Sequence, residues 1–173
     1  MEANSCPQQT LEQNWYVAYT CSRHEKYLAE QCEQRGISAF LPLYAVHRQW
    51  KQRRAEVLLP LFPSYVFVRM ALVERFRVLA LPGIVSLVSF KGHPAIVPDT
   101  QIEALRKAVT LGRAEPCAYL QSGKRVRVTA GPLLGLEGIV QEIKNKISVI
   151  VSFDWMNRSV LISLDAAELE VLR

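Results

Sequence analysis

The sequence predicts an α+β unit followed by a small all-β unit. In the first part of the chain, strand-like and helix-like hydrophobic periods alternate. The last part instead carries short β-branched runs separated by Gly and Pro. We therefore expect a flexible tail at 1–13, an α+β unit at 14–109, a linker at 110–121 and an all-β unit at 122–173.

The composition is that of a globular protein. Half of the 173 residues are hydrophobic and 21% are charged, which excludes a disordered or collagen-like chain. The apolar runs have the length of a strand and the first residues lack a signal-peptide pattern, so we expect a cytoplasmic protein without a membrane span. The net charge of +5 weakly favours a polyanionic partner.

The sequence offers little for catalysis or for metal binding. The four cysteines form no C-x-x-C pair and the three histidines lie far apart, so we expect free thiols and no metal site. A Gly-rich phosphate loop and a nucleophile elbow are both lacking. We therefore expect neither an enzyme nor a bound cofactor.

The first unit begins with a strand and a helix. Trp15–Thr20 is aromatic and β-branched, as strands are. The spacing of Ser22 and Glu25 predicts a capping box, which opens a helix that runs to Arg35 and ends at Gly36.

A long hairpin and further short elements follow. Residues 37–50 are expected to be extended, with Pro42 at an edge or bulge, and 56–61 to return after a basic tip. The remaining predicted elements are strands at 65–70 and 84–90 and a helix at 72–80. A last helix is predicted to start at Pro98 and to carry an apolar stripe of Ile102, Leu105, Ala108 and Val109.

The second unit is predicted to contain only strands. They are expected at 126–128, 138–143, 147–153, 159–164 and 169–172. Five short strands in so small a unit predict a closed barrel, because closure removes the exposed edges. The β-branched run at Ile147–Val151 favours a barrel that does not convert to helices.

Several motifs together resemble a known family. The glycine spacing and the Gly-Pro turn in Gly123–Val140 resemble the KOW motif of ribosomal proteins and transcription elongation factors. Trp15-Tyr16, Pro60–Val68 (P-L-F-P-S-Y-V-F-V) and Pro82-Gly83-Ile84 resemble the amino-terminal NGN domain of NusG-family transcription factors. The resemblance covers 14–173. Within the family, Pro60–Val68 and Pro94–Pro98 are closer to the specialised RfaH-like antiterminators, although Ser64 stands where many members have Gly.

The resemblance implies a fold and a function. The fold would be an NGN-type antiparallel sheet flanked by helices, followed by a Tudor-like, five-stranded KOW barrel. The function would be transcription elongation and antitermination without catalysis. In the family, the NGN domain binds the clamp helices of the largest RNA polymerase subunit and suppresses pausing. The KOW domain recruits partners such as termination factor Rho or the small ribosomal subunit. We expect a monomer.

The resemblance also suggests site residues in the first unit. Tyr19, Tyr65 and Phe67 would form an apolar docking patch for the clamp helices, since aromatic residues dominate interface anchors; the alternative is that they are ordinary core. Basic residues would contact the non-template DNA strand, unless they are merely solvated. They are Arg23, His24, Lys26, Arg75 and Arg77.

Two further elements complete the candidates. The hairpin tip carries basic residues that would meet upstream duplex DNA, namely Arg48, Lys51, Arg53 and Arg54. In the second unit, Phe153, Trp155 and Met156 would form an exposed patch for a partner, or Phe153 and Trp155 would close the end of the barrel.

Two other functions remain as alternatives. The first is a housekeeping NusG that also acts in Rho-dependent termination. The second is a KOW-type RNA-binding protein associated with the ribosome, which would leave the motif at Pro60–Val68 unexplained.

Overall fold

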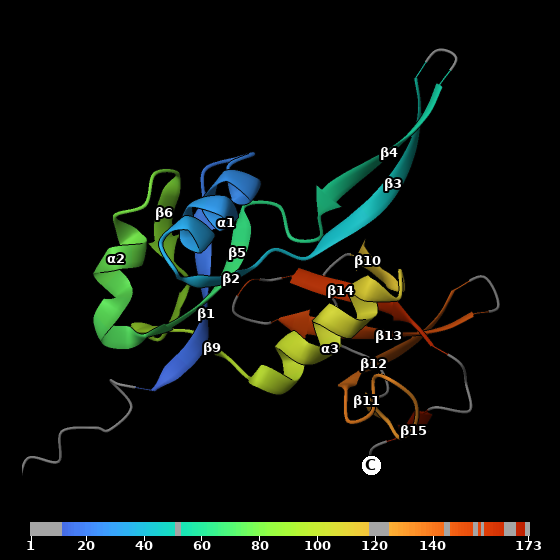
Figure 1. Cartoon of the computed structure of the whole chain (residues 1–173). Coiled ribbons are helices and arrows are strands. Elements are labelled where there is room, and N and C mark those ends of the chain that lie inside the picture. The colour runs from blue at the N-terminus through green and yellow to red at the C-terminus, as the bar shows by residue number, and fades with distance from the viewer. Residues whose placement is uncertain are drawn as a thin grey trace, which may run out of the picture. The chain divides into compact units, whose positions relative to one another are not determined.

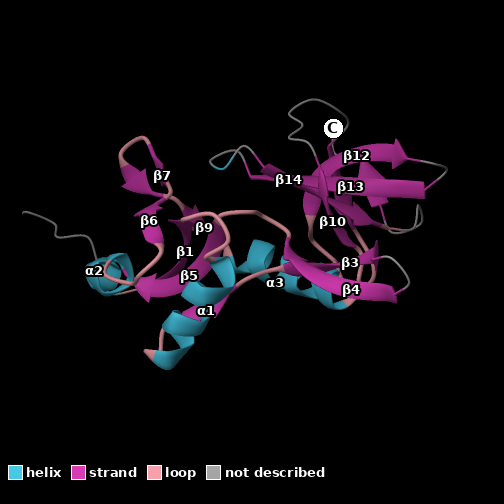
Figure 2. Cartoon of the chain, turned by 90° about the horizontal axis from the view of Figure 1, so that it is seen from above, coloured by secondary structure: helices cyan, strands magenta, loops and turns pink. Residues whose placement is uncertain are grey.

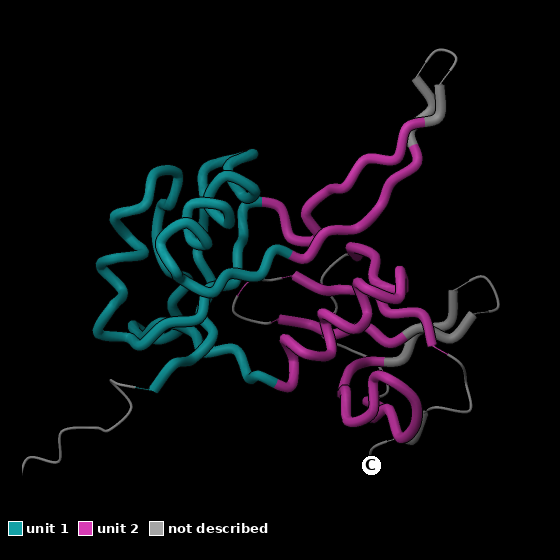
Figure 3. The backbone as a smooth tube through the Cα atoms, in the orientation of Figure 1, with its two compact units in different colours: residues 1–41, 64–99 teal, residues 42–63, 100–173 magenta. Residues whose placement is uncertain are grey.

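The protein was analysed as a computed structural model. It describes residues 12–50, 53–117, 125–143, 146–153, 156, 158–164 and 169–171. The backbone divides into two compact units, one of residues 1–41 and 64–99 and the other of residues 42–63 and 100–173 (Figure 3). These limits do not coincide with the predicted division, because the hairpin and the last helix of the expected first unit group with the C-terminal strands.

An antiparallel sheet forms the centre of the first unit (Figure 1). The strand order is β2-β5-β1-β6, and β9 also pairs with β1. The strands are β1 (Gln13–Thr20), β2 (Ser38–Phe40), β5 (Tyr65–Ala71), β6 (Ile84–Leu87) and β9 (Ile96–Val97). Every pairing among them is antiparallel, which confirms the expected α+β class for this part of the chain.

Helices cover one face of this sheet. Side chains of a strand alternate between the faces, so β1 and β5 send alternate residues to one side. Those residues pack with α1 (Glu25–Gln34), the short helix α2 (Arg75–Leu79) and the segments beside them in one buried cluster. Its members are Tyr16, Ala18, Leu28, Cys32, Ile37, Val66, Val68, Met70, Val78 and Leu81.

The start of α1 differs from the prediction, whereas its end agrees. Glu25 is the first helical residue and His24 is the N-cap, which makes no side-chain capping bond. A capping box needs its Glu three residues after the N-cap, so Ser22 and Glu25 are out of position and the prediction is wrong. Gly36 follows the helix with a φ of 69°, as expected of a glycine that ends a helix.

A hairpin, three short elements and one helix make up the remaining described segments between β2 and the C-terminal strands. The predicted hairpin consists of β3 (Leu43–Trp50) and β4 (Arg53–Pro60), paired from Leu43↔Pro60 to Trp50↔Arg53. Three further elements are the 3-10 turn η2 (Leu72–Glu74), β7 (Ser89–Phe90) and β8 (His93–Pro94). Helix α3 (Asp99–Thr110) buries the predicted apolar stripe of Ile102, Leu105 and Ala108.

A six-stranded antiparallel sheet dominates the second unit (Figure 2). Its order is β10-β14-β13-β12-β11-β15. The strands are β10 (Ala114–Cys117), β11 (Arg125–Val128), β12 (Glu137–Ile143), β13 (Lys146–Phe153), β14 (Arg158–Ser163) and β15 (Leu169–Val171). All five predicted strands are present, and β10 and β15 lie at opposite ends of the pairing order. Closure of this sheet into a barrel stays a prediction.

Strand β10 is a correction to the predicted linker. Arg113 O accepts a hydrogen bond from Ser163 N at 3.1 Å, and the β10–β14 register continues from there. Antiparallel pairs alternate, so the backbone of Ala114 and Pro116 points away from β14. Proline has no amide hydrogen and is tolerated where the backbone faces outward at an edge. Proline often interrupts regular structure and is compatible with the predicted linker, yet Pro116 lies in an edge strand.

The described residues carry free thiols and no metal-binding cluster. Cys21, Cys32 and Cys117 are all free, as expected. Among the described residues, no three or more His, Cys, Asp or Glu side chains form a group that could hold a metal ion. None of the helices in this part of the chain has the length and hydrophobicity needed to cross a membrane.

The buried thiol of Cys32 should make the protein less stable as the pH rises in the alkaline range. Burial raises the pKa of its thiol from 9.0 to about 11; nearby Arg35 lowers it and Glu33 raises it. Between pH 9.0 and about pH 11, the Cys32 thiol is deprotonated in the unfolded chain but stays protonated in the native protein. The free energy of unfolding should therefore fall by up to about 1.4 kcal/mol per pH unit from this group.

Urea denaturation from neutral pH to about pH 11 measures this slope. Cys32→Ala should fall less steeply than the wild type above pH 9.0, whereas Cys21→Ala, which changes an exposed thiol, should follow the wild type. Parallel curves for the wild type and Cys32→Ala would contradict the prediction.

Candidate functional site

Two tyrosines lie together where β1 ends and β5 begins. Tyr19 and Tyr65 are direct partners in the β1–β5 register, and their ring centroids are 5.4 Å apart. Tyr19 is 40% exposed and Tyr65 is half-buried. We call Tyr19 and Tyr65 the tyrosine pair. It offers an accessible aromatic surface on a strand face, as interface anchors do.

The backbone next to Tyr65 is held from two sides. Ser64 N donates a hydrogen bond of 2.7 Å to the carboxylate Oε1 of Glu25. Thr20 N donates one of 2.9 Å to Ser64 O. Ser64 has a φ of 67°, which is uncommon for residues other than Gly and explains why Gly suits this position. The tyrosine pair therefore stands on a fixed backbone.

Phe67 shares the strand face of the tyrosine pair but lies in the interior. It is 0% exposed, and its ring stacks on Phe40 with centroids 6.0 Å apart. Its register partner Val17 is also 0% exposed. Strand alternation correctly assigned the face of Phe67, yet in this structure the side chain is core. The expectation of an accessible docking residue is therefore corrected for Phe67.

The predicted basic residues before and within α1 differ in their surroundings. Arg23 and Lys26 are exposed, and Arg23 has a φ of 65°. The ring of His24 packs against Gly83, where a Cβ atom would lie 3.1 Å from it. His24 Nδ1 also lies 3.1 Å from Ser22 O. The His24 ring thus packs against Gly83 although the residue is exposed, and Arg23 and Lys26 are exposed as well.

The basic residues on α2 flank an aromatic ring that the sequence analysis missed. Phe76 is 65% exposed, and the guanidinium of Arg75 lies 4.5 Å from its ring centroid. Arg77 forms an ion pair of 2.7 Å with Glu74. The sequence R-F-R could have drawn attention to Phe76, because an aromatic ring between cations is typical of single-strand binding surfaces.

The predicted patch on the second unit is wrong for two of its three residues. Phe153 and Met156 are only 2% and 5% exposed, so both belong to the core. The ring of Phe153 meets that of Phe62 edge-on, with centroids 5.4 Å apart. Phe153 lies on the same face of β13 as the buried Val149 and Val151, which is consistent with its burial. Trp155 lies outside the described residues.

The basic hairpin tip is described only in part. The backbone of Arg48, Arg53 and Arg54 belongs to β3 and β4. Lys51 and the side chains of the other three lie outside the described residues, so the contact with upstream DNA stays a prediction.

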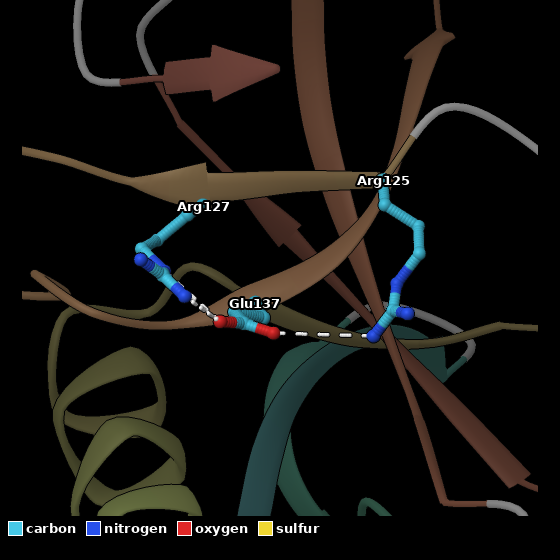
Figure 4. A network of polar contacts seen from close by, with 3 residues as sticks. All are labelled: Arg125, Arg127 and Glu137. Carbon is cyan, nitrogen blue, oxygen red and sulfur yellow. Dashed lines mark hydrogen bonds and ion pairs between the residues drawn. The ribbon is translucent and has the colours of Figure 1, made fainter. Parts of the chain in front are cut away.

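An exposed ionic network on β11 and β12 was also missed (Figure 4). Glu137 accepts a hydrogen bond of 2.9 Å from Arg127 Nε and lies 3.9 Å from Arg125. The hydrogen bond and charge of Arg127, with a smaller effect of Arg125, lower the pKa of the Glu137 carboxyl. The alternation R-V-R could have placed both arginines on one outward face.

Comparisons with known proteins show which family the chain belongs to. The sequence model of the family described as transcription termination factor nusG matches residues 13–106, more than half of the chain. Two curated relatives are named transcription termination/antitermination protein NusG. That of Pseudomonas aeruginosa is 27% identical, with 92% of this chain and 99% of the relative covered. That of Rickettsia bellii is 25% identical, with 80% of each covered.

A solved structure shares the fold. It is described as domain interaction in Thermotoga maritima NusG and superposes with a TM-score of 0.55 at 23% identity. The match covers 94% of this chain and 98% of that one. With a family match over most of the first unit, strands and tyrosine pair included, the chain belongs to the NusG family of transcription factors.

Proposed function

We propose that the protein is an elongation and antitermination factor that docks on the clamp helices of RNA polymerase through the tyrosine pair. The observation that carries this proposal is the accessible aromatic surface of Tyr19 and Tyr65. Large, rigid aromatic side chains with a partly exposed face act as anchors in protein interfaces. Phe67 contributes from the interior, by filling the core of the same sheet.

Docking suppresses pausing by shifting a conformational equilibrium. A ligand that binds the closed clamp more tightly than the open clamp increases the closed population by its difference in affinity. Catalysis by the factor itself is not needed, because binding alone supplies this free energy.

Basic residues of the first unit, exposed except for the partly buried Arg75, supply contacts to the non-template DNA strand. Arg23, Lys26, Arg75 and Arg77 offer charges for phosphates, which dominate such affinity. The exposed ring of Phe76 gives an unpaired base a surface on which to stack. His24 is exposed as well and belongs to the same proposed set, although its ring packs against Gly83.

The C-terminal strands recruit the partner. The family match over 13–106 supports polymerase binding by residues 14–109. The strands within 122–173 would then bind Rho or the small ribosomal subunit. Phe153 and Met156 are buried and cannot form this partner surface. Exposed residues such as Leu134, at 68% exposure, form it instead.

A housekeeping role in Rho-dependent termination is the second candidate. The names of the curated relatives include termination, which favours it. The form of Pro60–Val68 favours the specialised, RfaH-like role instead. Transcription of a Rho-dependent terminator separates the two: a housekeeping factor increases terminated product and a specialised one does not.

Removal of either ring of the tyrosine pair should weaken polymerase binding. We expect Tyr19→Ala and Tyr65→Ala each to raise the Kd for core RNA polymerase by about tenfold or more, the usual size for an interface anchor. Because binding is weaker, both variants should also suppress pausing less in single-round transcription. Tyr27→Ala, which removes a ring of similar exposure (44%) from α1, is the matched control. Unchanged affinity of a folded Tyr65→Ala protein would refute the docking site.

A further inference from the structure

A buried carboxylate joins two distant segments of the first unit. Glu25 is 6% exposed at the first position of α1. Its Oε1 accepts the hydrogen bond from Ser64 N across 39 residues of sequence. Burial of a carboxylate is unfavourable unless it is hydrogen-bonded, and a bond to the charged form is stronger than a neutral one. Glu25 therefore holds the backbone of Ser64 in place and, with it, the residues that directly follow Ser64.

The backbone of Ser64 needs such support. A φ of 67° in a residue with a Cβ atom costs free energy, and such conformations persist only where surrounding groups determine them. Glu25 holds the amide of Ser64, and Thr20 N holds its carbonyl. Together these bonds fix both peptide groups that flank the Ser64 Cα atom.

Tyr65 depends on this conformation more than any other residue of β5. It is the first residue of the strand, and Tyr19↔Tyr65 is the last pair of the β1–β5 register at that end. Beyond this pair, the bonds to Ser64 set the direction in which the chain enters β5. A rotation at Ser64 would turn the Tyr65 ring away from Tyr19.

We propose that Glu25 is a positioning residue for polymerase binding, which acts through Ser64 to hold Tyr65 against Tyr19. This inference rests on the proposed function of the tyrosine pair. Glu25 is itself too buried to supply a docking surface, so its effect on affinity passes through the tyrosine ring.

The test compares replacements at Glu25 that keep or remove the acceptor. Glu25→Gln keeps an amide oxygen at this position, and Glu25→Met keeps the bulk without a strong acceptor. Glu30→Ala, which changes an exposed glutamate of the same helix, is the control. Each full-length variant is examined by urea unfolding, by NMR for the Ser64 amide shift and the Tyr19–Tyr65 ring contacts, and by binding to core RNA polymerase.

We expect graded results. Glu25→Met should lose the ring contacts and bind polymerase about five- to tenfold more weakly, no more than the loss expected for Tyr65→Ala, because the ring is misplaced and not removed. Glu25→Gln should fall between Glu25→Met and the wild type, and Glu30→Ala should match the wild type. Ring contacts and affinity that stay unchanged in folded Glu25→Met would overturn the proposal. Should Glu25→Met fail to fold, the same two readouts in Glu25→Gln decide.

Tyr65→Ala separates this inference from the function on which it rests. If Tyr65→Ala binds polymerase normally, the docking site is wrong, while the ring contacts still test whether Glu25 positions Tyr65. If Tyr65→Ala binds weakly but Glu25→Met with displaced rings binds normally, the docking site stands and the role of Glu25 is refuted.

Discussion

Gly138→Ala is expected to destabilise the C-terminal sheet by about 3 kcal/mol or more, at the upper end of overpacking effects. A Cβ atom at Gly138 would lie 2.5 Å from the backbone oxygen of Ile150 and 2.5 Å from Cγ1 of Val149. Both neighbours belong to β13, which pairs with β12 beside Gly138. The Ile150 oxygen cannot withdraw without a shift of the strand backbone, so the clash must disturb the ladder.

Urea unfolding of the full chain measures this loss. Gly135→Ala is the matched control, because Gly135 has a φ of 86° and open space around its Cβ position. It should cost only about 1–2 kcal/mol, from the left-handed backbone alone. The prediction fails if Gly138→Ala is no more destabilising than Gly135→Ala.

Phe67→Ala is expected to cost about 3–5 kcal/mol of stability, the usual price of removing a fully buried phenylalanine. Phe67 is 0% exposed and stacks on Phe40, so truncation leaves a cavity beside the Phe40 ring. Tyr65→Ala, two residues earlier on the same strand face, should mainly change polymerase binding. The two variants therefore separate a structural effect from a functional one.

Thermal and urea unfolding provide the measurement for Phe67. Phe67→Leu, which keeps most of the apolar volume, should cost less than Phe67→Ala, by roughly 2 kcal/mol. If Phe67→Ala unfolds at the same urea concentration as the wild type, the burial of this ring in solution is refuted.

Several elements followed from local patterns. The first helix ends at Gly36, α3 buries the stripe of Ile102 and Leu105, and the C-terminal strands lie where β-branched runs predicted them. A glycine with positive φ, a helical period or a strand period expresses preferences of a few neighbouring residues. These features are therefore visible without knowledge of the rest of the fold.

Other predictions failed because the same local sequence pattern is compatible with two different local conformations. Ser22 and Glu25 have the spacing of a capping box, yet the partner of Glu25 is Ser64, 39 residues away. Pro116 is compatible with a linker and with an edge strand, and the choice depended on pairing with β14. In each case a distant segment decided between local alternatives.

The sequence by itself determined which residues share a strand face, because alternation is a property of the extended backbone. Alternation along β5 thus placed Tyr65 and Phe67 on one face, whereas Tyr19 was assigned to the same patch by the family resemblance and is paired with Tyr65 by the β1–β5 register. Only the tertiary structure decided that Tyr19 is 40% exposed while Phe67 and Phe153 lie in the core. Exposure depends on what packs over a face, and those segments come from distant parts of the chain.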